Sequence, residues 1–197
     1  MADYLTHYYL HDLGQFQTLS ELPDDEALDI MKALRDDTPF GSRFKDPARY
    51  LQNRKETERW VREGFIAKGG KPQESYPIPM VLGSSKWMVA NAPKRESNAE
   101  IRIPLAVVTE FDVSFTYPDS MISRWFGREK PADYYQPDLH GQIFMLSEIL
   151  SLVAVKGMPE EDWGVKMPPD LAPYIEAQIW NHERLTNYAK SLSGEES

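Results

Sequence analysis

The stretch "DVSFTYPDSMISRWFG" (residues 112–127) predicts a strand that turns sharply into a helix. Apolar and hydroxyl side chains alternate over its first half, as in a half-buried strand: Val113, Phe115 and Tyr117 on one face, Ser114 and Thr116 on the other. Pro118 then breaks the strand, Asp119 is a typical N-cap for a helix over 121–126, and Gly127 is expected to end that helix. A fold that contains this stretch packs strands and helices against each other.

Strands and helices continue on both sides of this stretch. Aromatic residues favour a strand over 3–11, and two strands that contain prolines are expected over 76–85 and 100–108. Apolar residues at helical spacing predict helices at 22–37, 45–70, 146–157 and 170–192. Because the elements do not follow a regular βαβα rhythm, the sequence predicts an α+β fold, with a small, mainly antiparallel sheet packed against several helices.

Single residues add detail to these elements. Pro79 and Pro104 lack the N–H that a strand ladder needs, so we expect edges or bulges of the sheet at both points. Ser147 is expected to cap the helix over 146–157, and Gly157 is expected to end it.

The composition indicates one soluble domain. With 197 residues, 41% of them hydrophobic and 27% charged, residues 1–192 are expected to form a single globular domain, followed by a disordered acidic tail at 193–197. The chain has no cysteine, which excludes a disulfide framework and a thiolate metal site and favours an intracellular protein. Neither a signal sequence nor a run of about 18 apolar residues is found, so we expect a cytoplasmic protein outside the membrane.

Charge is unevenly distributed along the chain. The net charge of −9 opposes binding to phosphate backbones, so no nucleic-acid partner is expected. Residues 43–71 hold nine Lys or Arg against four Asp or Glu, whereas residues 1–42 hold two against nine and residues 72–197 eleven against eighteen. Such a basic island indicates internal ion pairs, a pocket for a small anionic ligand, or a solvated helix face.

Arg54 and Glu58 are the most informative pair. On a helical wheel of residues 45–70 they fall at the centre of an apolar stripe formed by Tyr50, Leu51, Val61 and Phe65. Two charges on such a face need each other or a pocket, because removing one would leave the other buried at a cost of about 3–5 kcal/mol. The pair is therefore either a structural ion pair that docks the helix onto the sheet, or part of a cleft. In a cleft, Arg54 would fix an anionic group and Glu58 would orient it or act as a base.

His7 and His11 are four residues apart, the spacing at which a helix presents two zinc ligands. On the strand expected here they would stand roughly 13 Å apart, too far to share one ion. We therefore expect neither a metal nor a cofactor. His7 remains a polar candidate for a binding site, with Tyr9 on the same strand face, and a satisfied structural histidine is the alternative.

The opening stretch carries a second group of candidates. The hydroxyls of Ser114 and Thr116, the free N–H groups of the helix that Asp119 caps, and Arg124 suit an anion, while the neighbouring Trp125 and Phe126 suit a planar ring. A nucleotide-like or phosphorylated small molecule would satisfy both. Alternatively, Trp125 and Phe126 anchor the turn in the core and Arg124 extends to solvent.

Three segments resemble an uncharacterised family of small bacterial proteins with no assigned function: "DDTPFGSRFKDPARYLQNRKETERWVREGFIAKGG" (36–70), "YPIPMVLGSS" (76–85) and "SFTYPDSMISRWFG" (114–127). The resemblance covers most of the chain and implies a bacterial protein, but it brings no activity to these residues. A narrower likeness, an early strand with His7 and a later S-x-T strand at 114–116, is similar to ADP-ribosyltransferase-like folds. It implies a test with nucleotides, although the later E-x-E pattern of those folds is absent here.

The first hypothesis is a small-ligand-binding or protein-interaction module. We expect its pocket to be lined by His7, Tyr9, Arg54, Glu58, Ser114, Thr116 and Arg124. The alternative is an enzyme, a transferase or hydrolase acting on a nucleotide-like or phosphorylated small molecule. In that case Arg54 and Arg124 would hold the anion, and Glu58 or His7 would move a proton.

Two further classes stay open. Aromatic residues mark interfaces, so a structural subunit or homo-oligomer could pair through Tyr134, Tyr135, Trp163 and Trp180. Ser84 or Ser85 with His140 would suit a serine hydrolase, although the G-x-S-x-G motif is absent.

Overall fold

Five strands form one antiparallel sheet in the computed structural model, which describes residues 2–92, 96–159 and 171–193. The strands are β1 (Tyr4–Leu10), β2 (Ile78–Leu82), β3 (Asn98–Pro104), β4 (Val113–Thr116) and β5 (Glu176–Ile179). They lie in the order β3-β1-β2-β5-β4, and every neighbouring pair is antiparallel. The predicted α+β class with a small antiparallel sheet is confirmed.

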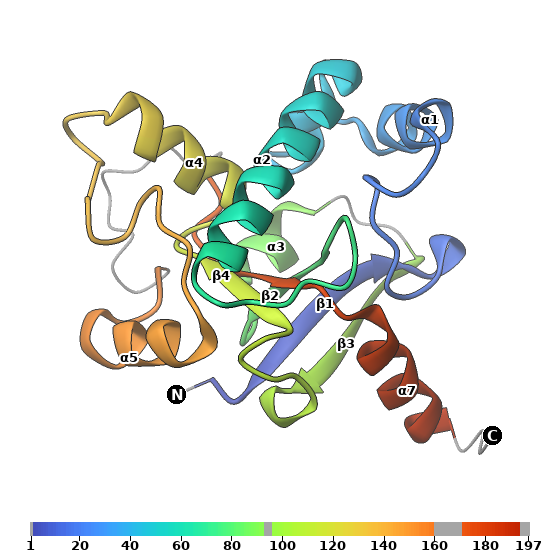
Figure 1. Cartoon of the computed structure of the whole chain (residues 1–197). Coiled ribbons are helices and arrows are strands. Elements are labelled where there is room, and N and C mark those ends of the chain that lie inside the picture. The colour runs from blue at the N-terminus through green and yellow to red at the C-terminus, as the bar shows by residue number, and fades with distance from the viewer. Residues whose placement is uncertain (1, 93–95, 160–170, 194–197) are drawn as a thin grey trace.

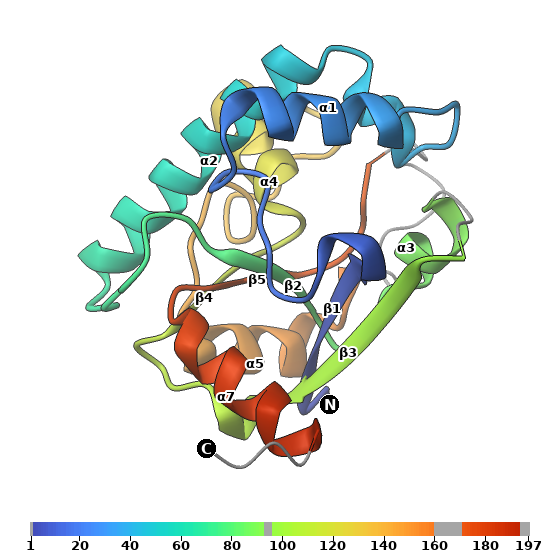
Figure 2. The ribbon, with the colours of Figure 1, turned by 90° about the vertical axis from the view of Figure 1, so that its right-hand side faces the viewer.

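The helices are α1 (Asp24–Leu34), α2 (Pro47–Ala67), α3 (Lys86–Asn91), α4 (Ser120–Glu129), α5 (Leu146–Lys156) and α7 (His182–Ser193), with 3₁₀ turns η1 (His11–Leu13), η2 (Gly41–Phe44) and η3 (Leu105–Val107). Figures 1 and 2 show α1, α2 and α4 on one side of the sheet and α5 and α7 on the other. Within the described ranges, no helix combines the length and apolar character needed to cross a membrane. Beyond Ser193, the tail predicted at 193–197 lies outside the described residues.

The two faces of the sheet differ in chemistry. Toward α5 and α7 the strands present buried apolar side chains, which form the main core: Leu5, Met80, Leu82, Phe115, Ala177 and Ile179. The opposite face is polar, because cross-strand partners share a face and Ser114 pairs with Gln178 and Thr116 with Glu176. The strand prediction for 112–117, with one apolar and one hydroxyl face, is confirmed.

α2 begins where the sequence predicts. Asp46 Oδ1 accepts a hydrogen bond from the backbone N–H of Arg49 at 3.1 Å, as expected of an N-cap. The apolar stripe of α2 packs in two places. Leu51 contacts the cluster of α1 and η2, whereas Phe65 stacks on Trp180 with 6.4 Å between ring centroids. The middle of the helix, between these two contacts, is left for polar residues.

The helix predicted over 170–192 is wrong in its first half. Residues 176–179 form β5, which lies between β2 and β4, and α7 begins only at His182. Tyr174, Ile175 and Gln178 had suggested a helical stripe. Polar and apolar residues nevertheless alternate over Glu176–Ile179, and pairing on both sides gives their backbone groups partners that outweigh local helical spacing.

Gly127 does not end the helix that follows β4. α4 runs on to Glu129, and Gly127 lies inside it. A Cβ added at Gly127 would lie 2.6 Å from Gly141 Cα, so the glycine serves the close approach of two backbone segments. Asp119 caps the helix as predicted, because its Oδ1 accepts from the N–H groups of Met121 and Ile122 at 3.0 and 3.2 Å.

The predicted cap of α5 is also different. Met145 takes the N-cap position, and its N–H donates to Glu148 Oε2 at 2.8 Å. Ser147 instead donates its hydroxyl to Glu110 Oε1 at 2.8 Å. Gly157 follows the last residue of α5 with a φ of 83°, and the predicted end is confirmed.

The two strand prolines occupy different places. Pro104 lies in the edge strand β3, as predicted. Pro79 lies in β2, which is an internal strand, but the register of β2 with β1 is confined to Leu82 and Val81. At Pro79 only β5 is paired, so the missing N–H costs no ladder bond to β1.

Candidate ligand site

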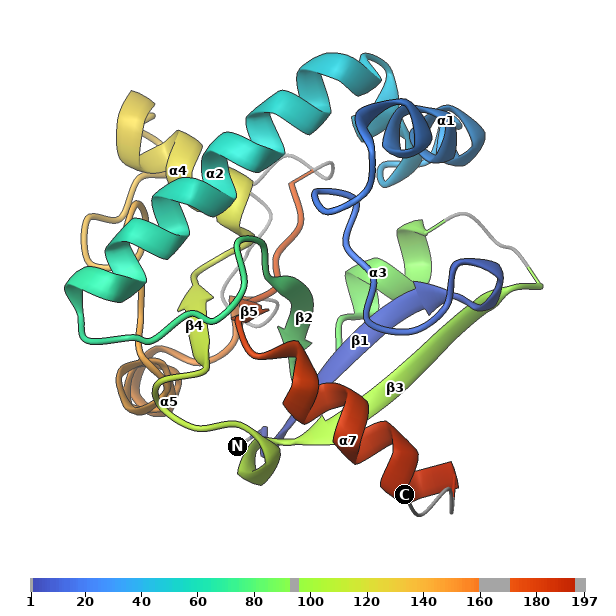
Figure 3. The same ribbon diagram turned by 45° about the vertical axis from the view of Figure 1, so that its right-hand side comes forward.

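A cavity of about 460 Å³ lies between the polar face of the sheet and the layer formed by α1, η2 and α2. Figure 3 shows these helices above the sheet, with β1 and β2 beneath them. The lining comes from segments far apart in the sequence, including β1, the loop 14–22, η2, α2, β2, the start of α4 and the start of β5. A concave site in which so many segments meet is the usual place for a ligand.

Arg54 and Glu58 face this cavity from the middle of α2. Arg54 Nε lies 2.9 Å from Glu58 Oε1, and the guanidinium also donates to Ser20 Oγ at 3.1 Å and Thr18 Oγ1 at 3.2 Å. Burial, the largest single influence, lowers the pKa of Arg54, but Glu58, Tyr50 and Glu176 together outweigh it and hold the pKa above its usual value. Burial also raises the pKa of Glu58, and Arg54 and Ser20 partly offset this effect. Glu58 Oε2 is buried without a hydrogen-bond partner among the described residues.

Arg43 of η2 and Asp119 form a second ion pair on the cavity wall. Arg43 Nη1 lies 3.7 Å from Asp119 Oδ2, which also accepts a hydrogen bond from the Tyr174 hydroxyl at 2.9 Å. The Arg43 guanidinium lies 5.0 Å from the centroid of the Trp87 ring. Burial and the charge of Asp119 raise the pKa of Tyr174 well above its usual value, so its hydroxyl stays a donor.

Glu176 stands beside this second pair, at the start of β5. Its Oε2 accepts a hydrogen bond from the backbone N–H of Ser120 at 2.7 Å. Burial, and then the charge of Asp119, raise the pKa of Glu176 to about 7, against the opposing effect of the Ser120 N–H. A carboxyl that titrates near neutral pH inside a cavity can take up and release a proton under ordinary conditions.

His7 lines the cavity on the side of β1. Its Nδ1 lies 3.1 Å from the carbonyl oxygen of Pro79, and its ring stacks on Tyr9 with 5.7 Å between centroids. Burial lowers the pKa of His7 to about 4, so the imidazole is neutral at pH 7. Because a carbonyl only accepts, Nδ1 carries the proton and Nε2 is an acceptor. His7 Nε2 is buried and has no hydrogen-bond partner within the described ranges.

Aromatic rings form much of the remaining wall. They come from β1, from η2 and the residue before it, and from the first turn of α2: Tyr8, Tyr9, Phe40, Phe44 and Tyr50. Phe44 and Tyr50 meet edge to face, with 5.0 Å between centroids. Such a wall suits the apolar or planar part of a ligand.

Four of the seven site residues predicted from the sequence line this cavity: His7, Tyr9, Arg54 and Glu58. Ser114 and Thr116 lie on the polar sheet face outside the lining, where both are fully buried. Ser114 Oγ donates to Gln178 Oε1 at 3.0 Å, and Gln178 Nε2 donates to Thr116 Oγ1 at 3.1 Å. Arg124 lies against α2, with Nη2 3.5 Å from Glu56 Oε2. These three residues support the framework around the cavity.

No family model, curated protein or solved structure matches the chain. The resemblance to an uncharacterised bacterial family therefore stays a prediction, and so does the likeness to ADP-ribosyltransferase-like folds. The chemistry of the cavity is the basis on which a function can be inferred.

The sequence prediction of the site missed Arg43, Tyr174 and Glu176. Arg43 lay between the helices expected at 22–37 and 45–70, and the other two lay in the helix expected over 170–192. Asp119 was assigned only the role of a cap. A signal for Glu176 existed, because polar and apolar residues alternate in "EAQI" (176–179) at the period of a strand.

Three of the other candidates named from the sequence, Ser85, His140 and Trp180, have structural roles. The Ser85 hydroxyl caps α3, and His140 Nδ1 accepts from the backbone N–H of Gln136 at 3.0 Å. Trp180 is fully buried, and its Nε1 donates to Ser114 Oγ at 2.9 Å. Tyr134 and Tyr135 are half-buried, and Trp163 lies outside the described residues.

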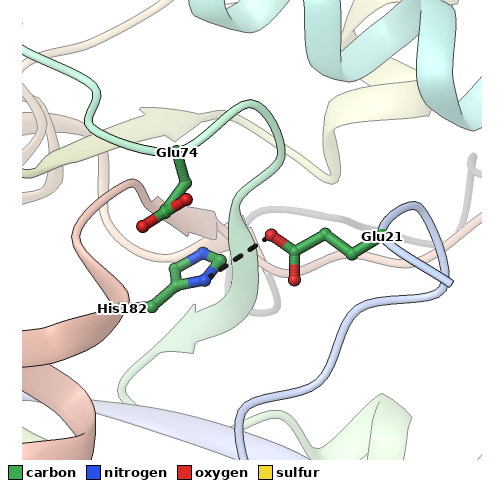
Figure 4. A group of neighbouring side chains, drawn as sticks. All are labelled: Glu21, Glu74 and His182. Carbon is green, nitrogen blue, oxygen red and sulfur yellow. Dashed lines mark ion pairs between the residues drawn. The ribbon is translucent and has the colours of Figure 1, made fainter.

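One further group could hold a metal. Glu21, Glu74 and His182 come from three separate segments, and their potential ligand atoms lie within 4.8 Å of one another (Figure 4). Carboxylate and imidazole together suit divalent first-row metals. His182 Nδ1 also lies 3.7 Å from Glu21 Oε1, so a protonated His182 forms an ion pair with Glu21. The loop that carries Glu21 also carries Thr18 and so lies next to the cavity.

Proposed function

We propose that the protein binds a small molecule in this cavity. The observation that carries the proposal is a pair of buried acceptors, His7 Nε2 and Glu58 Oε2, which belong to residues that line one cavity and have no partner among the described residues. His7 is only 3% exposed and Glu58 only 5% exposed. A buried polar atom left unpaired costs about 1–3 kcal/mol, and a ligand that donates to both atoms would offset that cost.

The shape and lining of the cavity support the same proposal. Its volume of about 460 Å³ falls in the range typical of pockets for small molecules. Polar groups come from the sheet, the loop 14–22, η2 and α2, and aromatic rings and leucines line the same cavity. This mixture suits a ligand with both polar and apolar or planar parts.

A protein-interaction module has weaker support. The large apolar side chains that are exposed among the described residues come from separate segments: Ile66, Val89, Phe111, Trp125, Val155 and Leu192. Single exposed apolar residues are normal for a protein surface, whereas interfaces present continuous patches. The cavity is therefore the better candidate for a binding function.

A thermal-shift screen of small metabolites tests the proposal. We expect at least one compound to raise the melting temperature of the wild type, because a ligand that binds only the folded state stabilises it. Glu58→Gln should reduce this shift, since it changes one of the two buried acceptors. The matched control is Glu63→Gln on the exposed side of α2, which should keep the full shift. Equal shifts for both variants would contradict the proposal.

An enzyme is the second candidate, and the observation that favours it is the pKa of about 7 for Glu176. Glu58 and His7 were the groups proposed from the sequence for proton transfer, but Glu58 is paired with Arg54 at 2.9 Å and burial lowers the pKa of His7 to about 4. Glu176 is the better group for proton transfer, because it titrates near neutral pH and lies beside Asp119 and the Tyr174 donor. The substrate would be turned over by a transferase or hydrolase reaction at the start of β5.

Glu176→Gln separates the two candidate functions. The amide keeps an oxygen that can accept the hydrogen bond from the Ser120 N–H, but it cannot exchange a proton. If the protein is an enzyme, turnover found in a substrate screen that includes nucleotides should fall at least about a hundredfold, as is typical for a lost acid or base. Binding of the same compound should persist. Unchanged turnover would rule out Glu176 as the acid or base.

A further inference from the structure

The charges that line the cavity are already balanced or acidic. Arg43 and Arg54 line the cavity together with four acidic residues: Glu58, Glu100, Asp119 and Glu176. Each arginine has a carboxylate of its own, at 2.9 Å for Arg54 and 3.7 Å for Arg43. An anionic ligand would have to compete with these two carboxylates for the guanidinium groups.

The start of α4 does not provide an anion site either. Asp119 Oδ1 accepts hydrogen bonds from the N–H groups of Met121 and Ile122 at 3.0 and 3.2 Å. The N–H of Ser120 donates to Glu176 Oε2 at 2.7 Å. The donors with which a helix N-terminus would bind a phosphate are therefore occupied by the protein's own carboxylates.

The unpaired groups are acceptors. His7 donates its Nδ1 proton to the Pro79 carbonyl, so Nε2 offers a lone pair. Glu58 Oε1 is engaged by the Arg54 cation, so Glu58 is a carboxylate and its Oε2 also accepts. Both residues line the same cavity, which is also lined by Tyr8, Tyr9 and other aromatic residues. Ring faces carry partial negative charge and likewise attract N–H groups and cations.

We infer that the cavity selects ligands that present N–H or O–H donors and carry no negative charge, such as an amine, amidine or amide attached to a ring, over anions of the same shape. This inference rests on the proposed binding function and adds the class of ligand. It replaces the anionic ligand expected from the basic island, because the two arginines of that island that line the cavity, Arg43 and Arg54, are each paired with a carboxylate of the protein.

Three probes of one shape test the inference: phenylacetamidine, phenylacetamide and phenylacetate. They share a ring and a planar end group, but the first is a cation with several donors, the second a neutral amide and the third an anion without donors. Binding is followed in ¹H–¹⁵N spectra of the wild-type protein through the amide signals of the cavity lining. We expect the amidine and the amide to shift these signals, and phenylacetate to bind at least about tenfold more weakly. That factor corresponds to about 1.4 kcal/mol, within the range of one hydrogen bond to a charged group.

Two variants locate the effect. His7→Phe keeps a ring that can stack on Tyr9 but removes the Nε2 acceptor, and it should weaken amidine binding about tenfold. Glu63→Gln, outside the cavity, should leave binding unchanged. The comparison of the three probes on the wild type does not depend on either variant folding.

The outcomes separate this inference from the proposed function. If phenylacetate shifts the cavity signals as strongly as the amidine, the inference is overturned while small-molecule binding stands. If none of the three probes shifts these signals, the inference is overturned as well. The proposed function would be contradicted as well only if no metabolite raised the melting temperature in the thermal-shift screen.

Discussion

Arg54 Nε lies 2.9 Å from Glu58 Oε1 in the middle of α2, where an otherwise apolar stripe passes over the cavity. The side chains are 16% and 7% exposed, so each charge depends on the other. Apolar contacts on either side, at Leu51 and Phe65, hold the helix and leave the pair to face the cavity.

Breaking this pair should destabilise the fold more than removing it. Arg54→Met leaves Glu58 as an unpaired buried charge, and we expect the free energy of unfolding to fall by about 3–5 kcal/mol. The double variant Arg54→Met with Glu58→Met removes both charges and should recover a large part of this loss. Urea unfolding of the wild type, both single variants and the double variant measures the coupling. Additive losses would show that the two residues act independently.

Asp119 should contribute more to the free energy of unfolding than an ordinary N-cap residue does. Asp119→Ala removes the cap of α4 and also the partner of Arg43 and Tyr174, so we expect a loss of about 3 kcal/mol. Asp46→Ala, at the exposed cap of α2, is the matched control and should cost about 1 kcal/mol. Thermal or urea unfolding of both variants gives the comparison. Equal losses would mean that the ion pair with Arg43 contributes nothing.

Glu176 should make stability depend on pH. Its folded-state pKa of about 7 lies above the value of 4.5 expected for the unfolded chain, so the folded state binds protons more tightly. The stabilisation that this gives is present below about pH 4.5 and is lost as pH rises through about 7. Relative to the wild type, Glu176→Gln should therefore gain at least about 1 kcal/mol of stability between about pH 5 and about pH 8. Urea unfolding across this range measures it.

His7 provides the comparison of opposite sign. Its folded-state pKa of about 4 lies below the usual 6.5, so the stability that comes with the neutral ring is present above about pH 6.5 and is lost as pH falls toward 4. His7→Gln should therefore gain stability relative to the wild type as pH falls over that window. If both variants gained stability relative to the wild type in the same direction of pH, the pKa shift assigned to Glu176 or to His7 would be wrong.

Gly127 should not tolerate a methyl group. A Cβ at this position would lie 2.6 Å from Gly141 Cα, and two backbone segments would have to separate. We expect Gly127→Ala to cost about 1–3 kcal/mol despite the better helix propensity of alanine. In Gly64→Ala the new Cβ would meet the Ile143 side chain, which can rotate away, so the cost should be smaller. Chemical unfolding of both variants decides the order.

Local patterns in the sequence predicted much of the fold. The α2 stripe, the cap at Asp46 and the alternation of 112–117 are all short-range signals, and the structure confirms each of them. The same stripe placed Arg54 and Glu58 together on the inner face of α2. Prediction works here because the periodicity of a single element determines which side chains it turns inward.

The rest of the site depends on contacts that no local pattern contains. The local sequence of β5 predicts a helix, and only pairing with β2 and β4 makes it a strand. The sequence alone therefore did not place Glu176 on the cavity lining. Arg43 reaches Asp119 across 76 positions of sequence, and that encounter is created by packing alone. The hydroxyls of Ser114 and Thr116 were predicted to bind an anion, whereas Gln178 of the unpredicted strand β5 forms hydrogen bonds with both.

Native mass spectrometry of freshly purified protein, followed by denaturing release, tests the binding function most directly. We predict that the wild type and Glu63→Gln carry a small molecule without a phosphate or carboxylate group, and that Glu58→Gln carries much less of it. A wild type that shows only the mass of the bare chain, and no melting shift with any metabolite, would contradict the account.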